Sequence, residues 1–271
     1  MLLAVRQLTT YRYAQPIASV IQTLRLTPRA FDGLTVIRWR VRGDRARGMP
    51  SYVDGFGNLV HLHAINRPHQ NSTVLVEGQV ETQDTGGAVR GAPEPLPPAF
   101  FLRTTPLTQP DAAIAELAAE GARGGTTHDR LLGLMHAVHQ RVAYQRGSTD
   151  AATSAASALA NGSGVSQDHA HLLIAACRAL DVPARYVAGY LWTGAHGEDR
   201  WASHAWVEAY LENEGWFGFD SANATPPSEA HIRISVGLDY WSAAPVRGFR
   251  RGEAEETLSV TVEVAAAQGA Q

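Results

Sequence analysis

Apolar and polar residues alternate in short runs over the first eighty residues of the chain. A period of two is typical of half-buried strands, and clusters of Gly, Asn and Asp between such runs indicate turns. The cluster Asp54–Asn58 is the clearest of these turns. Residues 1–82 are therefore predicted to form an antiparallel, β-sandwich-like domain. The expected strands are Val5–Tyr13, Val20–Leu26, Leu34–Val41, Leu59–Ile65 and Thr73–Val80.

Two histidines, His61 and His63, fall on one face of an expected strand. Such a pair could begin a metal site, but no third ligand is spaced to join it. These two histidines are therefore expected to lie on an exposed face of the strand and not to bind a metal ion.

Residues 83–110 are rich in Gly and Pro, which predicts a connector between two domains. Phe100 and Phe101 are expected to anchor this connector on a surface. Helices are expected after it, with Thr127 as the cap of the second. Their ranges are Asp111–Ala122, Asp129–Val142 and, for a short third helix, Ala155–Ala160.

The apolar period becomes helical after Gly162. The residues that recur at helical spacing are Ala170, Leu173, Ile174, Cys177 and Leu180. Pro183 ends this helix, because proline lacks the N–H that the helix needs. Ser166 then lies at the amino end of a buried helix, where free N–H groups and the helix dipole favour negative charge. That position suits a nucleophile.

The segment after the helix predicts a strand at Arg185–Leu191 and then a hairpin, with strands at Ser203–Tyr210 and Trp216–Asp220. If residues 211–215 form a five-residue loop, Tyr210 faces Trp216, and His204 lies on the same face as Asp220, one diagonal step away. A four-residue loop would place one of these two on the other face.

The remaining segments are a polar loop at Thr193–Arg200 and strands at Ile232–Val236 and Leu258–Val264, with an irregular stretch between those strands. The resulting domain plan has an α+β core over residues 111–225, in which a helix packs on an antiparallel sheet. Residues 226–271 are expected to form a C-terminal β extension and tail.

Composition narrows the class of protein. A net charge of -3 gives no indication of a nucleic-acid or membrane partner. The single cysteine, Cys177, excludes an internal disulfide and a cysteine zinc cluster. Eleven residues of helix place it about 16 Å from Ser166, so we expect a buried apolar residue and not a working thiol. Because the first residues are too short an apolar run for a signal sequence, a cytoplasmic location is expected.

Three ordered motifs resemble the bacterial form of the transglutaminase-like, papain-related superfamily. Gly164-Val165-Ser166-Gln167-Asp168 is similar to the Gly-Val-Cys-Gln-Asp run of that family, with serine in place of the nucleophilic cysteine. Residues 203–208 resemble its histidine motif and residues 215–220 its aspartate motif. The opening segment Val5–Asp54 and the tail His231–Gly252 also resemble this group.

The resemblance implies a papain-like core and a nucleophile–histidine–aspartate triad formed by Ser166, His204 and Asp220. The Ser166 N–H would hold the oxyanion, and Tyr144 is the predicted second donor. The implied chemistry is acyl transfer from, or hydrolysis of, a peptide or other amide substrate. No metal or organic cofactor is implied.

Serine at the nucleophile position leaves three interpretations. A hydroxyl cannot be held ionised as a thiolate can, so the site is expected to be inactive or weakly active. The serine could be a cysteine substitution introduced to silence the enzyme, a natural loss that leaves a binding module, or the nucleophile of a natural serine-using hydrolase. The first is favoured because histidine and aspartate are both retained.

Overall fold

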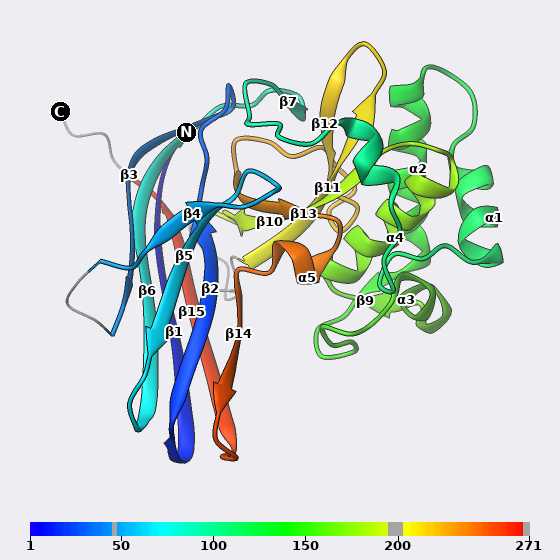
Figure 1. Cartoon of the computed structure of the whole chain (residues 1–271). Helices are drawn as coiled ribbons and strands as arrows, with labels where there is room; N and C mark the ends of the chain where they lie inside the picture. Colours follow the sequence, from blue (N-terminus) through cyan, green and yellow to red (C-terminus); the bar gives the residue numbers. More distant parts are fainter. Residues whose placement is uncertain (45–47, 195–202, 268–271) are drawn as a thin grey trace.

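The computed structural model describes residues 1–44, 48–194 and 203–267, in which an α+β core adjoins a β-sandwich. The sandwich strands are Leu2–Ile17 (β1), Ser19–Thr27 (β2), Leu34–Gly43 (β3), Ser51–Val53 (β4), Leu59–Ile65 (β5), His69–Thr82 (β6), Val246–Arg251 (β14) and Glu256–Ala266 (β15). They form two antiparallel sheets, ordered β15-β1-β6-β3 and β14-β2-β5-β4. These sheets occupy the left of Figure 1. The expected sandwich is therefore confirmed.

Alternation along the strands explains the packing of the sandwich. Every second residue of β1 from Leu3 to Tyr13 is buried, as the two-residue period requires. Leu24 and Leu26 of β2 pack against Val74 and Val76 of β6 in the interior. The short β4 has three exposed residues and no alternation, so the sequence pattern did not reveal it.

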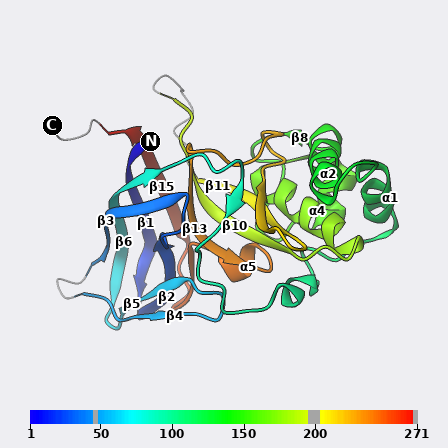
Figure 2. The same ribbon diagram turned by 90° about the horizontal axis from the view of Figure 1, so that it is seen from above.

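The core sheet lies between the sandwich and the helices (Figures 1 and 2). It is ordered β13-β10-β11-β12-β7. The bounds are Ala88–Val89 (β7), Ala184–Leu191 (β10), Ser203–Leu211 (β11), Gly215–Phe219 (β12) and His231–Gly237 (β13). Tyr190, Ile232 and Ile234 of this sheet pack with Leu3, Val5 and Leu34 of the sandwich in one apolar cluster. The sandwich is thus seated directly on the core sheet.

The helices cover the other face of the core sheet. They are Ala112–Gly121 (α1), Thr127–Arg141 (α2), Ala155–Asn161 (α3), Ser166–Ala179 (α4) and Tyr240–Ala243 (α5). A 3-10 turn at Pro98–Leu102 (η1) packs instead through Phe101 against Trp216 and Arg185. The short pair Ala143–Tyr144 (β8) and Ser163–Gly164 (β9) joins the end of α2 to the start of α4. Helix α4 is buried along almost its whole length between the sheet and α1, α2 and α3.

The connector is anchored as expected. Phe101 of η1 is buried and meets Trp216 edge-to-face, with ring centroids 5.2 Å apart. Arg178 of α4 donates hydrogen bonds to the Phe101 carbonyl and to Thr108 Oγ1, which ties the connector to the central helix.

Three local predictions are wrong. The cap of α2 is Thr126, whose hydroxyl accepts the Asp129 N–H while the Asp129 carboxylate accepts the Thr126 N–H. The stretch expected to be irregular contains β14, a largely exposed strand that is held by pairing with β2 and has no apolar alternation. His61 and His63 do not form an exposed face, because His63 is fully buried and bonds Gln22 Oε1 at 3.1 Å.

The segment predicted as a C-terminal extension divides between the two layers. Its first strand, β13, joins the core sheet, and β14 and β15 join the two sandwich sheets. The predicted loop Thr193–Arg200 lies mostly outside the described residues. Within the part of the chain that the structure describes, each helix is too short or too polar to span a bilayer.

Cys177 lies on the buried face of α4, as expected, and we predict that it reacts slowly in the folded protein. Burial raises the pKa of its thiol to about 12, so thiolate is scarce at neutral pH. Alkylation by iodoacetamide should be about a thousandfold slower in native protein than in urea-unfolded protein, where the pKa returns to about 8.5. Equal rates in the two states would contradict this placement.

Candidate active site

Ser166 is the first residue of α4, and the residues around it fix the start of the helix. The Asp168 carboxylate accepts the Val165 N–H at 2.8 Å and the Thr149 hydroxyl at 2.6 Å. A side chain at Gly164 would meet Asp168 at 2.6 Å, so glycine is required there. Asp168 is therefore a helix-start residue, whose carboxylate holds the first turn of α4. Ser166 is 8% exposed, so it is largely buried but keeps some contact with solvent at the start of the helix.

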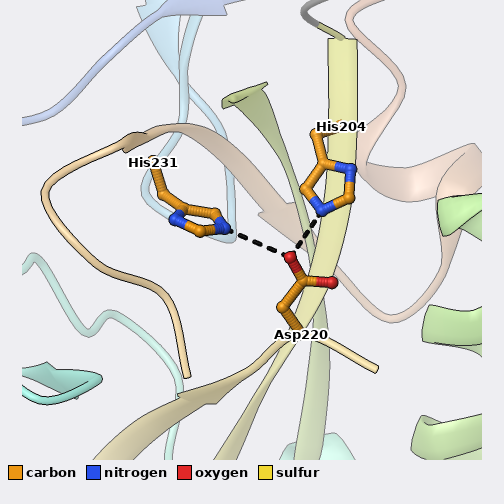
Figure 3. Close-up of side chains that lie close together, drawn as sticks. All are labelled: His204, Asp220 and His231. Atoms are coloured by element: carbon orange, nitrogen blue, oxygen red, sulfur yellow. Dashed lines mark hydrogen bonds and ion pairs between the residues drawn. The ribbon is translucent and has the colours of Figure 1, made fainter. Parts of the chain in front are cut away.

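His204 and Asp220 meet across the hairpin of β11 and β12. Tyr210 pairs with Trp216, which is the register that the five-residue alternative required. Asp220 follows the last residue of β12, and its Oδ2 lies 2.7 Å from His204 Nε2 (Figure 3). Trp206 stacks against the His204 ring at 6.3 Å. The diagonal contact predicted from the strand pattern is therefore present.

A second histidine, His231, was not predicted as a site residue. It begins β13, and its Nε2 lies 3.2 Å from the same Asp220 oxygen (Figure 3). Its Nδ1 accepts the Ser228 N–H at 3.1 Å, so the ring proton must be on Nε2, which donates to Asp220. The sequence signal was its place in the tail that resembles the family, but nothing local linked it to Asp220.

The hydrogen bonds around Asp220 define its charge. Oδ1 accepts the backbone N–H groups of Ala222 and Asn223, and Oδ2 accepts Asn223 Nδ2 besides the two imidazoles. Burial opposes ionisation, but His204 and His231 outweigh it and hold the pKa of the Asp220 carboxyl well below its usual range. A carboxylate at this position makes His204 Nε2 a donor, which leaves Nδ1 as the basic nitrogen of the ring.

His204, Asp220 and His231 could also be considered as ligands of a metal ion. Among the described residues they are the only group of three His, Cys, Asp or Glu side chains whose ligand atoms all lie within 4.8 Å of one another. Bound metal would require both imidazole Nε2 atoms to lose their protons. The Ser228 N–H already occupies His231 Nδ1, and the separations of 2.7 and 3.2 Å are those of hydrogen bonds. The arrangement therefore fits a hydrogen-bonded triad better than a metal centre.

Ser166 and His204 line one cavity of about 340 Å³. Tyr144, predicted as a second oxyanion donor, is not among the residues that line it. Tyr144 is half exposed on β8, and its ring lies 6.4 Å from that of His169. The structure thus places Ser166 and His204 in the lining of one cavity and pairs His204 with Asp220, which His231 also contacts.

Comparison with known proteins identifies the family and the fold. Residues 115–221 match the model of the transglutaminase-like superfamily, and residues 3–81 match that of the bacterial transglutaminase-like N-terminal region. An uncharacterized protein of Mycobacterium leprae is 32% identical over 270 residues, covering 94% of this chain and 95% of its own length. An uncharacterized protein of Mycobacterium tuberculosis is 28% identical over 287 residues, covering 96% and 91%.

Among solved structures, one named "Putative Cysteine Protease" from Cytophaga hutchinsonii superposes with a TM-score of 0.79 at 23% identity, covering 100% of this chain and 92% of that one. The fold is thus the transglutaminase-like fold with an N-terminal β domain. The chain belongs to the transglutaminase-like superfamily.

Proposed function

We propose that this site is built for cysteine-type acyl transfer or hydrolysis on a peptide or other amide substrate, with serine in place of the nucleophilic cysteine. The observation that carries the proposal is the His204 Nε2–Asp220 bond of 2.7 Å. It leaves Nδ1 as the basic nitrogen on a ring that lines the same cavity as Ser166. Residue 166 also begins a buried helix, where the free N–H groups favour an anion.

In the proposed reaction the nucleophile at position 166 attacks the substrate carbonyl carbon, and its proton passes to His204 Nδ1. The carbonyl oxygen becomes an oxyanion that faces the backbone N–H of residue 166. Collapse of this intermediate breaks the carbon–nitrogen bond, and the leaving amine takes the proton from His204. Water or a second amine then attacks the acyl-enzyme and gives its proton to His204. The bond between the acyl group and residue 166 breaks, and the proton passes from His204 back to the nucleophile.

Serine lowers the expected rate at the first step. A thiol beside an imidazole and a helix amino end ionises readily, whereas a hydroxyl must lose its proton during the attack. The hydroxyl is also shorter than a thiol, which holds the oxygen further from the carbonyl. We therefore propose that serine at position 166 makes the chain inactive or weakly active, and that His204 and Asp220 remain arranged for catalysis.

The test is Ser166→Cys in a Cys177→Ala background. The introduced thiol should alkylate with a pKa well below the 8.5 of a free cysteine. The same protein should release amine from an amide or ester donor. His204→Ala should abolish that release, and the control His136→Ala, which changes an exposed residue of α2, should not.

Two results would contradict the proposal. A thiol pKa near 8.5 without turnover would favour a binding module. Turnover by the unchanged chain that is lost in Ser166→Ala would identify a natural serine-using hydrolase.

A further inference from the structure

The cavity beside Ser166 has walls from both layers of the molecule. The core supplies Tyr186 and Ala188 of β10 and Ile234 of β13, together with His204. The sandwich supplies the opposite wall from three of its strands, with Tyr11 of β1, Leu26 of β2 and Val260 of β15. Any acyl group that reaches Ser166 through this cavity therefore contacts the sandwich as well as the core.

A hydrogen-bond chain holds these two walls together. The Tyr190 hydroxyl of the core donates to Gln7 Oε1 of β1 at 2.6 Å. Gln7 Nε2 then donates to Thr9 Oγ1 at 3.0 Å, and all three side chains are buried. The polar groups of this wall thus satisfy one another and do not require a charged ligand.

The part of the cavity lining that the structure describes includes one imidazole, that of His204, and no carboxylate, ammonium or guanidinium group. Burial raises the pKa of Tyr11 to about 12, and burial likewise raises the pKa of Tyr186, Tyr190 and Tyr240, so these phenols are neutral at physiological pH. A charged group placed against these described walls of neutral side chains would lose hydration and would find no carboxylate, ammonium or guanidinium group among them to pair with.

We infer that this cavity is the acyl-donor pocket, and that it selects a donor whose group next to the reactive carbonyl is apolar and uncharged. The inference rests on the function proposed above. The volume of about 340 Å³ is at the lower end of ligand pockets, which suits one bulky side chain or a short acyl segment. Val260 is one of the sandwich residues that line the cavity, and it is half-buried and pairs with Thr9. Its side chain is therefore expected to contribute to the preference for apolar donors.

Binding to the unchanged chain, with Ser166 in place, tests the inference. The probes are capped pentapeptide amides that differ only in a central Phe, Leu, Lys or Glu, measured by ligand-observed NMR. The Phe and Leu peptides should bind about tenfold or more tightly than the Lys and Glu peptides, because only they gain from burial. Val260→Lys should lower the affinity for the Phe peptide and raise that for the Glu peptide.

Leu62→Lys is the matched control, since Leu62 is an aliphatic residue of the same sandwich outside the cavity. It should leave the order of the peptides unchanged. If Val260→Lys does not fold, Leu258→Lys places the same charge at a rim position that is 52% exposed.

Equal affinity for all four peptides, or a preference that ignores the new lysine, would overturn the inference. Turnover in the Ser166→Cys protein separates this result from the proposed function. An inert Ser166→Cys protein with intact peptide preference would overturn the function and support the apolar selectivity. Turnover with equal use of all four peptides would overturn the selectivity alone.

Discussion

In the Ser166→Cys protein, Asp220→Asn is expected to lower kcat/KM by about a hundredfold or more. The carboxylate orients His204 and stabilises the imidazolium that forms during attack, and a charge-assisted bond of this kind contributes about 3 kcal/mol, or about a hundredfold in rate. Asparagine cannot replace it. Its amide NH2 would face either the two histidine Nε2–H groups or the backbone N–H groups of Ala222 and Asn223.

The pH dependence distinguishes positioning from a purely structural role. Loss of the carboxylate should raise the pKa of the introduced thiol, because the imidazolium that stabilises the thiolate is itself less stable. The rate of alkylation against pH measures this shift. A decrease in kcat/KM of less than about fivefold, with an unchanged thiol pKa, would show that Asp220 is not part of the triad.

Asp54→Asn is the matched control. Asp54 also accepts two backbone N–H groups at one oxygen, from Phe56 and Asn58, and its other oxygen pairs with Arg25 at 2.9 Å. It is outside the lining of the active-site cavity. Asp54→Asn should therefore leave kcat/KM and the thiol pKa unchanged.

Glu208→Gln is expected to lower the free energy of unfolding by about 3–5 kcal/mol, the usual cost of removing one partner from a buried ion pair. Glu208 of β11 is fully buried and bonds Arg185 of β10 at 2.6 Å and Arg233 of β13 at 2.7 Å. The variant leaves two buried guanidinium groups with only the carboxylate of Glu94, which pairs with Arg185. Urea unfolding measures the loss.

The effect of Glu208 on stability should depend on pH. Burial alone would raise the pKa of Glu208, but Arg233 and Arg185 outweigh it and lower the pKa to about 2. Because the pKa is lower in the folded state than the unfolded value of about 4.3, the contribution is fully present above that unfolded value. It is lost as the pH falls toward about 2. The difference between wild type and Glu208→Gln should therefore shrink as the pH is lowered from about 6 to about 3.

Glu94→Gln is the control, since Glu94 contacts the same arginine but its side chain is 34% exposed. It should cost no more than about 1 kcal/mol. A similar cost for both variants would show that burial does not decide the effect. The network joins the strands that carry His204 and His231, so its loss should also loosen the candidate site.

Local sequence pattern was sufficient for several parts of this molecule. The helical period that begins after Gly162 placed Ser166 at the start of a buried helix, and Pro183 marked where that helix ends, because each signal depends only on residues close to it in the sequence. The hairpin pattern brought His204 to Asp220 once the loop was taken as five residues. The alternative of a four-residue loop was decided only by the observed pairing of Tyr210 with Trp216.

Only the tertiary structure decided the rest. His231 meets Asp220 because β13 pairs with β10 on the far side from β11, and this pairing is not encoded by any short motif. The sandwich wall of the cavity depends on β15, which pairs with β1 across almost the whole length of the chain. Strand β14 has no apolar alternation, and it forms because its backbone pairs with β2 at the edge of the sheet. Sequence periodicity reports which face of a segment is buried, but the partner that buries it is chosen by contacts between distant parts of the chain.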